Sequence, residues 1–279
     1  MTLTNIAAMG TIANNNQIGK DLTSSLERLN TGLRINKASD DASGLSIADK
    51  LRTQASSLNQ SISNGNSAVA LTQIADGAME EISDSLDVIK SKLIQASSDT
   101  TSTEGRENIR KDISKLLKQI DSIAKDTNYN GVQLLAKSDG SATDALTFQM
   151  GEKSSSTIST DGSVRANSEG LTLDSLRDLA ANGLDKSTAQ AGITSLDSAI
   201  STLNGWRGDF GSTQNQIESS IRNMLTTETN IKAAESVIRD VDYEAETVNF
   251  NKLNVQTQAG SYALSQANAI QQNILRLLQ

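Results

Sequence analysis

Residues 203–245 read LNGWRGD FGSTQNQ IESSIRN MLTTETN IKAAESV IRDVDYE A in blocks of seven. Every block begins with an apolar residue: Leu203, Phe210, Ile217, Met224, Ile231, Ile238 and Ala245. A second, mixed series follows three residues later: Trp206, Thr213, Ser220, Thr227, Ala234, Val241 and Val248. An unbroken period of seven predicts a long helix that packs along one seam. The hydroxyl residues in the second series favour a bundle of several helices over a self-sufficient two-stranded coiled coil.

A second long helix is predicted over about residues 42–95. Its apolar positions advance by alternating steps of four and three, with two successive steps of three at Val69, Thr72 and Ala75. The doubled step resembles a stammer, which overwinds a coiled coil locally. At 1.5 Å per residue this helix would be roughly 80 Å long. Because helices of compact globular domains rarely exceed about 20 residues, the pattern predicts an elongated bundle.

The middle of the chain changes character. A shorter amphipathic helix is predicted over about residues 104–125, with the apolar face Ile109, Ile113, Leu116, Ile120 and Ile123. The turn signal Asn128–Gly131 ends it. Two strand-like pieces follow, Leu146–Met150 and Thr157–Thr160, within a Ser-, Thr-, Gly- and Asp-rich region. The predicted fold is therefore mainly α, an elongated bundle of long N- and C-terminal helices with a small central β-hairpin region.

Both ends are nearly free of charge yet periodic. Lys20 and Asp21 are the only charged residues among the first 26, and Lys252 and Arg276 the only ones from Thr247 onward. The periodic positions are Leu22, Leu26, Leu29 and Leu33 at one end and Ala259, Ala263, Ala267, Ile270, Ile274 and Leu278 at the other. Isolated helices of this kind are marginal in water. We therefore expect these ten residues to form an assembly interface, and both ends to fold when they pack against copies of the chain.

Composition excludes several kinds of chemistry. The 279 residues include no His, Cys or Pro, and 25 basic against 33 acidic side chains give a formal charge of −8. Zinc, copper and iron–sulfur sites lose their usual ligands, and Ser-His-Asp and Cys-His nucleophile arrangements are excluded. An acidic chain is also poorly suited to bind nucleic acid or an anionic membrane. We predict no enzyme, no cofactor, and no catalytic or metal-binding residue.

Several motifs resemble those of bacterial flagellins. At the N-terminal end these are Leu26–Asn36 (LERLNTGLRIN), Asp40–Gly44 (DDASG) and Ile47-Ala48, followed by Asn128–Gly131 (NYNG) with Leu134 and Leu135. At the C-terminal end these are Ala234–Glu246 (AESVIRDVDYEAE), Gln258–Gly260 (QAG) and Ala267–Gln279 (ANAIQQNILRLLQ). Together the matches leave only about residues 137–190 uncovered, which makes the resemblance specific.

The resemblance implies a self-assembling structural subunit of the flagellar filament, located outside the cell. By analogy, residues 1–38 and 245–279 would form an inner coiled-coil segment that is disordered in the monomer. Residues 39–244 would form a rod, with the β-hairpin and loop at 132–170 and no large outer domain. Expected partners are further copies of the chain, an export chaperone at the C-terminus, and the filament cap and junction proteins. Export would use the flagellar type III apparatus without a cleaved signal peptide.

Two surface features belong to the same resemblance. Flagellins detected by Toll-like receptor five carry arginine, leucine and glutamate at the positions of Val88, Lys92 and Asp112. Because a charge at position 92 would have to be desolvated in the contact, we expect weak receptor activation or none. A Ser/Thr cluster is a candidate for O-glycosylation: Ser154, Ser155, Ser156, Thr157, Ser159 and Thr160. The same cluster also suits an unmodified, solvated loop.

Two other functions fit the helical pattern. A hook–filament junction protein shares terminal helices with flagellins, and a secreted coiled-coil adapter would act as a monomer. The N-terminal signature and the final Leu-Leu-Gln favour the filament subunit over the junction protein. Concentration-dependent formation of filaments separates the subunit from the adapter.

Overall fold

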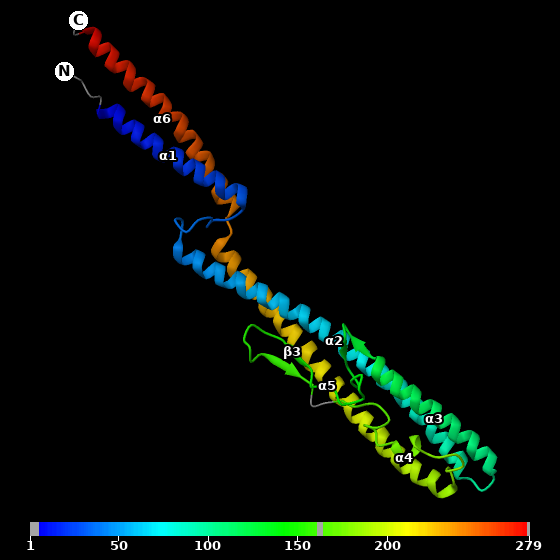
Figure 1. Ribbon diagram of the computed structural model, residues 1–279. Coiled ribbons are helices and arrows are strands. Elements are labelled where there is room, and N and C mark those ends of the chain that lie inside the picture. Colours follow the sequence, from blue (N-terminus) through cyan, green and yellow to red (C-terminus); the bar gives the residue numbers. More distant parts are fainter. Residues whose placement is uncertain (1–5, 161–163, 278–279) are drawn as a thin grey trace. The chain divides into compact units, whose positions relative to one another are not determined.

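The computed structural model describes residues 6–160 and 164–277, and these are mainly helical (Figure 1). The long helices are α1 (Ile6–Thr31), α2 (Ala42–Ser97), α3 (Thr103–Asp126), α5 (Lys186–Arg239) and α6 (Tyr243–Leu277), and α4 (Asp174–Arg177) is a single turn. The strands are β1 (Asn128–Tyr129), β2 (Val132–Gln133), β3 (Thr147–Gln149) and β4 (Thr157–Ser159). The predicted mainly α class with a small central hairpin is confirmed, and the described residues between α3 and α5 form no large outer domain.

The chain divides into two compact units. The terminal unit comprises the described residues up to 55 together with those from 228 onward, and the central unit comprises residues 56–227. Helices α2 and α5 each contribute residues to both units.

The core of the central unit is a long stripe of aliphatic side chains. Helix α2 supplies Met79, Ile82, Leu86, Ile89 and Leu93, all completely buried, at steps of three and four residues. The α5 heptads supply Leu203, Phe210, Ile217 and Met224, also buried. Burying one such side chain stabilises the fold by about 1.5–3 kcal/mol. The first four positions of the predicted α5 seam therefore lie in the core, as the period of seven requires.

The predicted inward face of α3 needs a correction. Its buried residues are Ile109, Ile113, Leu117, Ile120 and Ala124, whereas Leu116 and Ile123 are half-buried. The stripe through Leu117 and Ala124 keeps strict steps of four and three, and a helix aims such a stripe at a single neighbour. The side-chain hydroxyl of Ser102 caps the helix by accepting from the amide of Gly105 at 3.1 Å.

Two small hairpins follow α3. The predicted turn at Asn128–Gly131 is the tip of β1–β2, where Asn130 and Gly131 adopt positive φ angles of 51° and 83°. Turns with two positive φ angles favour Asn-Gly. Helix α3 itself ends earlier, at Asp126, because Thr127 is already extended. The second hairpin pairs Phe148 of β3 with Ile158 of β4. It lies within the two segments that were predicted to be strands.

The long heptad pattern conceals a break. The period of seven runs through Ala245, but α5 ends at Arg239 and α6 begins at Tyr243. Between them Asp240 forms an isolated antiparallel bridge with Leu33. The Val241 amide donates to the Gly32 carbonyl at 3.0 Å, and the Arg34 amide to the Arg239 carbonyl at 2.6 Å. The expectation of one continuous helix was wrong, because pairing with the segment after α1 interrupts it.

Candidate assembly surfaces

Helices α1 and α6 of the terminal unit pack along their length (Figure 1). From Phe250 onward, the buried and half-buried positions described on α6 are spaced by three and four: Phe250, Leu253, Thr257, Gly260, Leu264 and Ala267. On α1, a series of buried and half-buried positions has the same spacing: Thr11, Asn15, Ile18, Leu22, Ser25 and Leu29. A Cβ atom at Gly260 would lie 2.5 Å from the Asn15 side-chain oxygen, so the helices approach closely there. The two nearly uncharged ends therefore share one seam within the chain.

The structure distributes the ten predicted assembly residues over two surfaces. Leu22, Leu29 and Leu33 are half-buried, and Leu26 is 47% exposed. Ala259, Ala263 and Ile270 are exposed, whereas Ala267 is half-buried in the α1 seam. The Ile274 side chain and Leu278 lie outside the described residues. The leucines on α1 thus serve mainly the intrachain seam, and the α6 residues lie mainly on the free face of that helix.

The free face of α6 carries a stripe that the sequence reasoning missed. Val248, Val255 and Tyr262 are spaced by seven residues and are 69%, 65% and 74% exposed. The sequence does contain a signal for this stripe. If the second heptad series is extended beyond Val248 by two blocks of seven, it reaches Val255 and Tyr262. Large apolar groups this exposed and this regularly spaced mark a protein contact surface.

Polar contacts connect the end of α1 to the start of α6. The Ser25 hydroxyl donates to Glu246 Oε1 at 2.5 Å, and Arg28 Nη1 lies 3.7 Å from Glu246 Oε2. Gly32 has a φ of +74°, and a Cβ atom there would lie 2.8 Å from the Tyr243 hydroxyl oxygen. Glycine is therefore the residue that fits both the backbone and the space at position 32.

The three positions that differ from flagellins detected by Toll-like receptor five, Val88, Lys92 and Asp112, lie in the central unit. Val88 is 46% exposed on α2. Lys92 Nζ forms an ion pair with Asp112 Oδ2 at 2.9 Å, which links α2 to α3. The hydrogen bond from Lys92 lowers the pKa of Asp112. Two of the three positions are thus occupied by a charged pair.

The Ser/Thr cluster surrounds the β3–β4 turn. Ser154, Ser155, Thr157 and Ser159 are exposed, and Ser156 is half-buried. Thr160 is buried, and its Oγ1 accepts from the Leu146 amide at 2.9 Å. The exposed hydroxyls are accessible to a modifying enzyme, whereas Thr160 is a poor acceptor.

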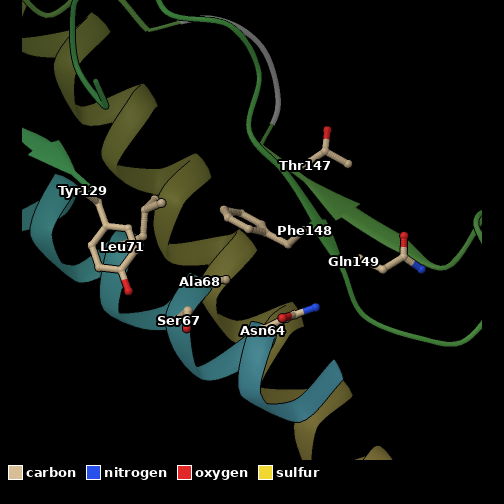
Figure 2. Close-up of a pocket in the computed structure, with 8 residues that line it drawn as sticks. All are labelled: Asn64, Ser67, Ala68, Leu71, Tyr129, Thr147, Phe148 and Gln149. Carbon is tan, nitrogen blue, oxygen red and sulfur yellow. The ribbon is translucent and has the colours of Figure 1, made fainter. Parts of the chain in front are cut away.

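A cavity of about 310 Å³ lies between α2 and the two hairpins (Figure 2). Its lining consists of Asn64, Ser67, Ala68, Leu71, Tyr129, Thr147, Phe148 and Gln149. None of these eight side chains is a carboxylate, lysine or arginine. In the described part of the chain no three metal-ligating side chains gather into a metal-binding cluster. No helix among the described residues has the length and hydrophobicity to cross a bilayer.

Comparison with known proteins accounts for both ends of the chain. Residues 2–139 match the bacterial flagellin N-terminal helical region, and residues 193–278 match the bacterial flagellin C-terminal helical region. The chain belongs to the bacterial flagellin family. Without a large outer domain, it is a short flagellin.

Individual flagellins align over nearly the whole chain. The flagellin of Bacillus subtilis is 34% identical over an alignment 304 positions long, which covers 99% of this chain and 98% of its own. The flagellar filament 33 kDa core protein of Treponema phagedenis is 33% identical over 266 residues and covers 91% of each chain. A crystal structure of Bacillus cereus flagellin, 28% identical, superposes with a TM-score of 0.50 over 62% of this chain and 94% of that one.

Proposed function

We propose that this flagellin is a structural subunit that self-assembles into the bacterial flagellar filament for swimming motility. Family membership supports the proposal, as do the names of relatives described as flagellins and filament core proteins. The observation that carries it is the free apolar face of α6, which a solitary soluble chain would have no use for. These relatives favour the filament subunit over the junction protein and the adapter.

Assembly proceeds by contacts between different surfaces of identical chains. Such heterologous contacts propagate without closing, and they generate an open helical polymer. Residues 1–38 and 245–279 supply the apolar and amide surface of the inner layer, and they become ordered as this surface is buried between copies. Residues 39–244 form the surrounding rod.

Seeded regrowth of filaments tests the function. Filaments are depolymerised by heat, and the purified chain is mixed with short filament fragments as seeds. We expect elongation from the seeds, visible by electron microscopy and by sedimentation, above a critical concentration. A chain that stays in the supernatant at every concentration, with or without seeds, would contradict the proposed function.

The location of the subunit and its remaining partners follow from its role in the filament. The subunit acts outside the cell in the flagellum and reaches it by type III export without a cleaved signal peptide. An export chaperone covers the C-terminal helix, whose free face would otherwise promote premature association, and the cap and junction proteins contact the assembled ends. No catalysis, cofactor, nucleic acid or membrane contact is part of this function. Co-purification of the full-length chain with a chaperone, lost when α6 is removed, tests the chaperone contact.

Weak activation of Toll-like receptor five is a separate proposal. The Lys92–Asp112 ion pair supports it, because an apolar receptor contact at position 92 would have to break this pair and desolvate the lysine. Purified monomer should stimulate receptor reporter cells weakly or not at all. The triple variant V88R/K92L/D112E should respond more strongly, and a full-strength response to the unmodified chain would refute the proposal.

O-glycosylation is proposed for the exposed hydroxyls around the β3–β4 turn, Ser154, Ser155, Ser156, Thr157 and Ser159. The intact mass of native filament protein would then exceed the sequence mass of 29.6 kDa by whole sugar units. An intact mass equal to the sequence mass would refute it.

A further inference from the structure

The outer surface of α3 carries a lysine face, Lys111, Lys115 and Lys118. Steps of four and three residues place the three side chains on the side of α3 opposite to its buried stripe. All three are exposed, and none forms an ion pair with another described residue. Three other charges of the same helix are paired inside the chain, in Glu107–Arg110 and Lys92–Asp112. No ion pair covers the lysine face, although Lys111 and Lys115 lie close enough to Glu107 and Asp112 to help lower the pKa of those two carboxyls.

The outer surface of α2 carries the opposite charge on an acidic face, Glu81, Asp84 and Asp87. The three carboxylates are exposed and make no ion pair among the described residues. The acidic groups that flank them toward α5 are engaged, since Arg207 Nε lies 2.8 Å from Asp76 and Arg207 Nη2 lies 3.9 Å from Glu80. As on α3, no ion pair covers this outward face, although Asp84 and Asp87 lie close enough to Arg207 and Lys90 to help raise the pKa of those two bases.

We propose that the lysine face of one copy docks on the acidic face of a second copy of the same chain. The proposal rests on the filament function and names a surface through which central units meet. The complementary charge identifies a second copy as the binding partner, because each face carries three charges along about two helical turns. Because the two faces differ, each copy can donate one and accept the other, which makes the contact heterologous.

The positions of the two faces within the central unit allow this contact. The Lys92–Asp112 pair and the hydrogen bond from Arg106 Nε to the Ala96 carbonyl show that α2 and α3 run antiparallel (Figure 1). In that register the centres of the two faces differ by only roughly 8 Å along the helices. In a neighbouring copy of the same orientation, the lysine face therefore reaches the height of the acidic face after a small shift along the axis.

Charge reversal on full-length chains tests the contact. The lysine-reversed chain K111E/K115E/K118E has a formal charge of −8 − 6 = −14, and the acid-reversed chain E81K/D84K/D87K has −8 + 6 = −2. The combined chain carries all six changes and returns to −8. We expect each triple variant to raise the critical concentration for seeded assembly at least about tenfold, and the combined chain to assemble nearly as well as the unmodified chain. Circular dichroism should show equal helix content throughout.

A matched single substitution controls for net charge. Lys153 is exposed near the β3–β4 turn and forms no ion pair among the described residues, so K153E changes the charge as K115E does. K115E should weaken assembly more than K153E. Unimpaired assembly of the lysine-reversed chain would overturn the inference and leave the filament function standing, and so would failure of the combined chain to recover. Failure of the unmodified chain to assemble would instead overturn the function itself.

Discussion

At the scale of single residues, one glycine controls a tight turn in the central unit. A Cβ atom at Gly170 would overlap the carbonyl oxygen of Arg165, a backbone atom that cannot rotate away. Gly205, in the middle of α5, has open space around it. The same substitution should therefore have opposite effects at the two positions.

We expect G170A to lower the free energy of unfolding by more than about 2 kcal/mol, because the turn must distort. G205A should raise it by roughly 0.5–1 kcal/mol, since alanine favours a helix over glycine. Urea unfolding of the soluble chain, followed by circular dichroism, measures both. Equal effects at the two sites would show that the steric argument is mistaken.

The carboxylate of Glu107 provides a prediction about pH. Hydrogen bonds from Arg110, at 2.7 and 2.9 Å, and from the Asn182 amide, at 2.8 Å, lower the pKa of Glu107 to about 2. Because the pKa is lower in the folded chain, the stabilisation is complete above the ordinary value of 4.5 and is lost as the pH falls toward 2. The E107Q chain should lose less stability than the unmodified chain between pH 5 and pH 2.

Glu104 supplies the control for that prediction. It is exposed in the first turn of the same helix. The E104Q chain keeps the contacts of Glu107 to Arg110 and Asn182, so it should keep the loss of stability that these contacts cause between pH 5 and pH 2. If E104Q and E107Q flattened the curve equally, the contacts to Arg110 and Asn182 would not be its source.

The sequence predicted the environment of some individual residues correctly and that of others wrongly. Periodicity placed Ile109, Ile113 and Ile120 correctly, but a choice between adjacent leucines depends on the direction of the neighbouring helix, and Leu117 is the buried one. Likewise, Thr160 looks like its neighbours in the Ser/Thr cluster, and only the fold shows that its hydroxyl is bonded to the Leu146 amide.

At the scale of helices and strands, the sequence predicted that a long helix exists and how far it extends, but it did not predict where a helix is interrupted. The predicted helix over 42–95 agrees with α2 at Ala42–Ser97 because its apolar period is long and regular. The break between α5 and α6 depends on pairing between Leu33 and Asp240, which are far apart in the sequence. Its one local signal is Asp242, which caps α6 by accepting from the Glu244 and Ala245 amides. A heptad pattern reports which side chains can share a face, and it is insensitive to backbone pairing with a distant segment.

The exposed stripe on α6 leads to a prediction about assembly. V255D should raise the critical concentration for filament growth at least about tenfold, because an unpaired carboxylate would be buried against a neighbour. V255I keeps an apolar side chain at the same position and should assemble normally. Sedimentation of seeded reactions compares the two, and equal assembly of V255D and V255I would exclude Val255 from the interface.

At the scale of the whole molecule, the two units differ in how much they bury. In the described part of the terminal unit, Ile35 and Leu253 are the only large apolar side chains that are buried. The central unit buries a continuous core from α2, α3 and α5. Regions with few buried apolar contacts open most readily, so the terminal unit should be the less stable one in an isolated chain.

Limited proteolysis should reveal that difference. Brief digestion of the soluble monomer should remove material from both ends and leave a resistant fragment that contains residues 56–227. In assembled filaments the same bonds within α6 should be cut far more slowly, because neighbouring copies cover them. Mass spectrometry identifies the fragments, and equal resistance of α6 and α3 in the monomer would contradict the predicted ordering on assembly.

The pairing of the first long helix with the last also links assembly to completeness of the chain. The Ser25–Glu246 hydrogen bond spans 221 residues, so α1 meets its partner only after nearly the entire chain has been synthesised and delivered. A chain that stops early leaves α1 without α6 and lacks the apolar stripe of that helix. A truncated chain would therefore not be added to the growing tip of the filament, and no separate protein would be needed to exclude it. Only a full-length chain carries the α6 surface to which the next subunit binds.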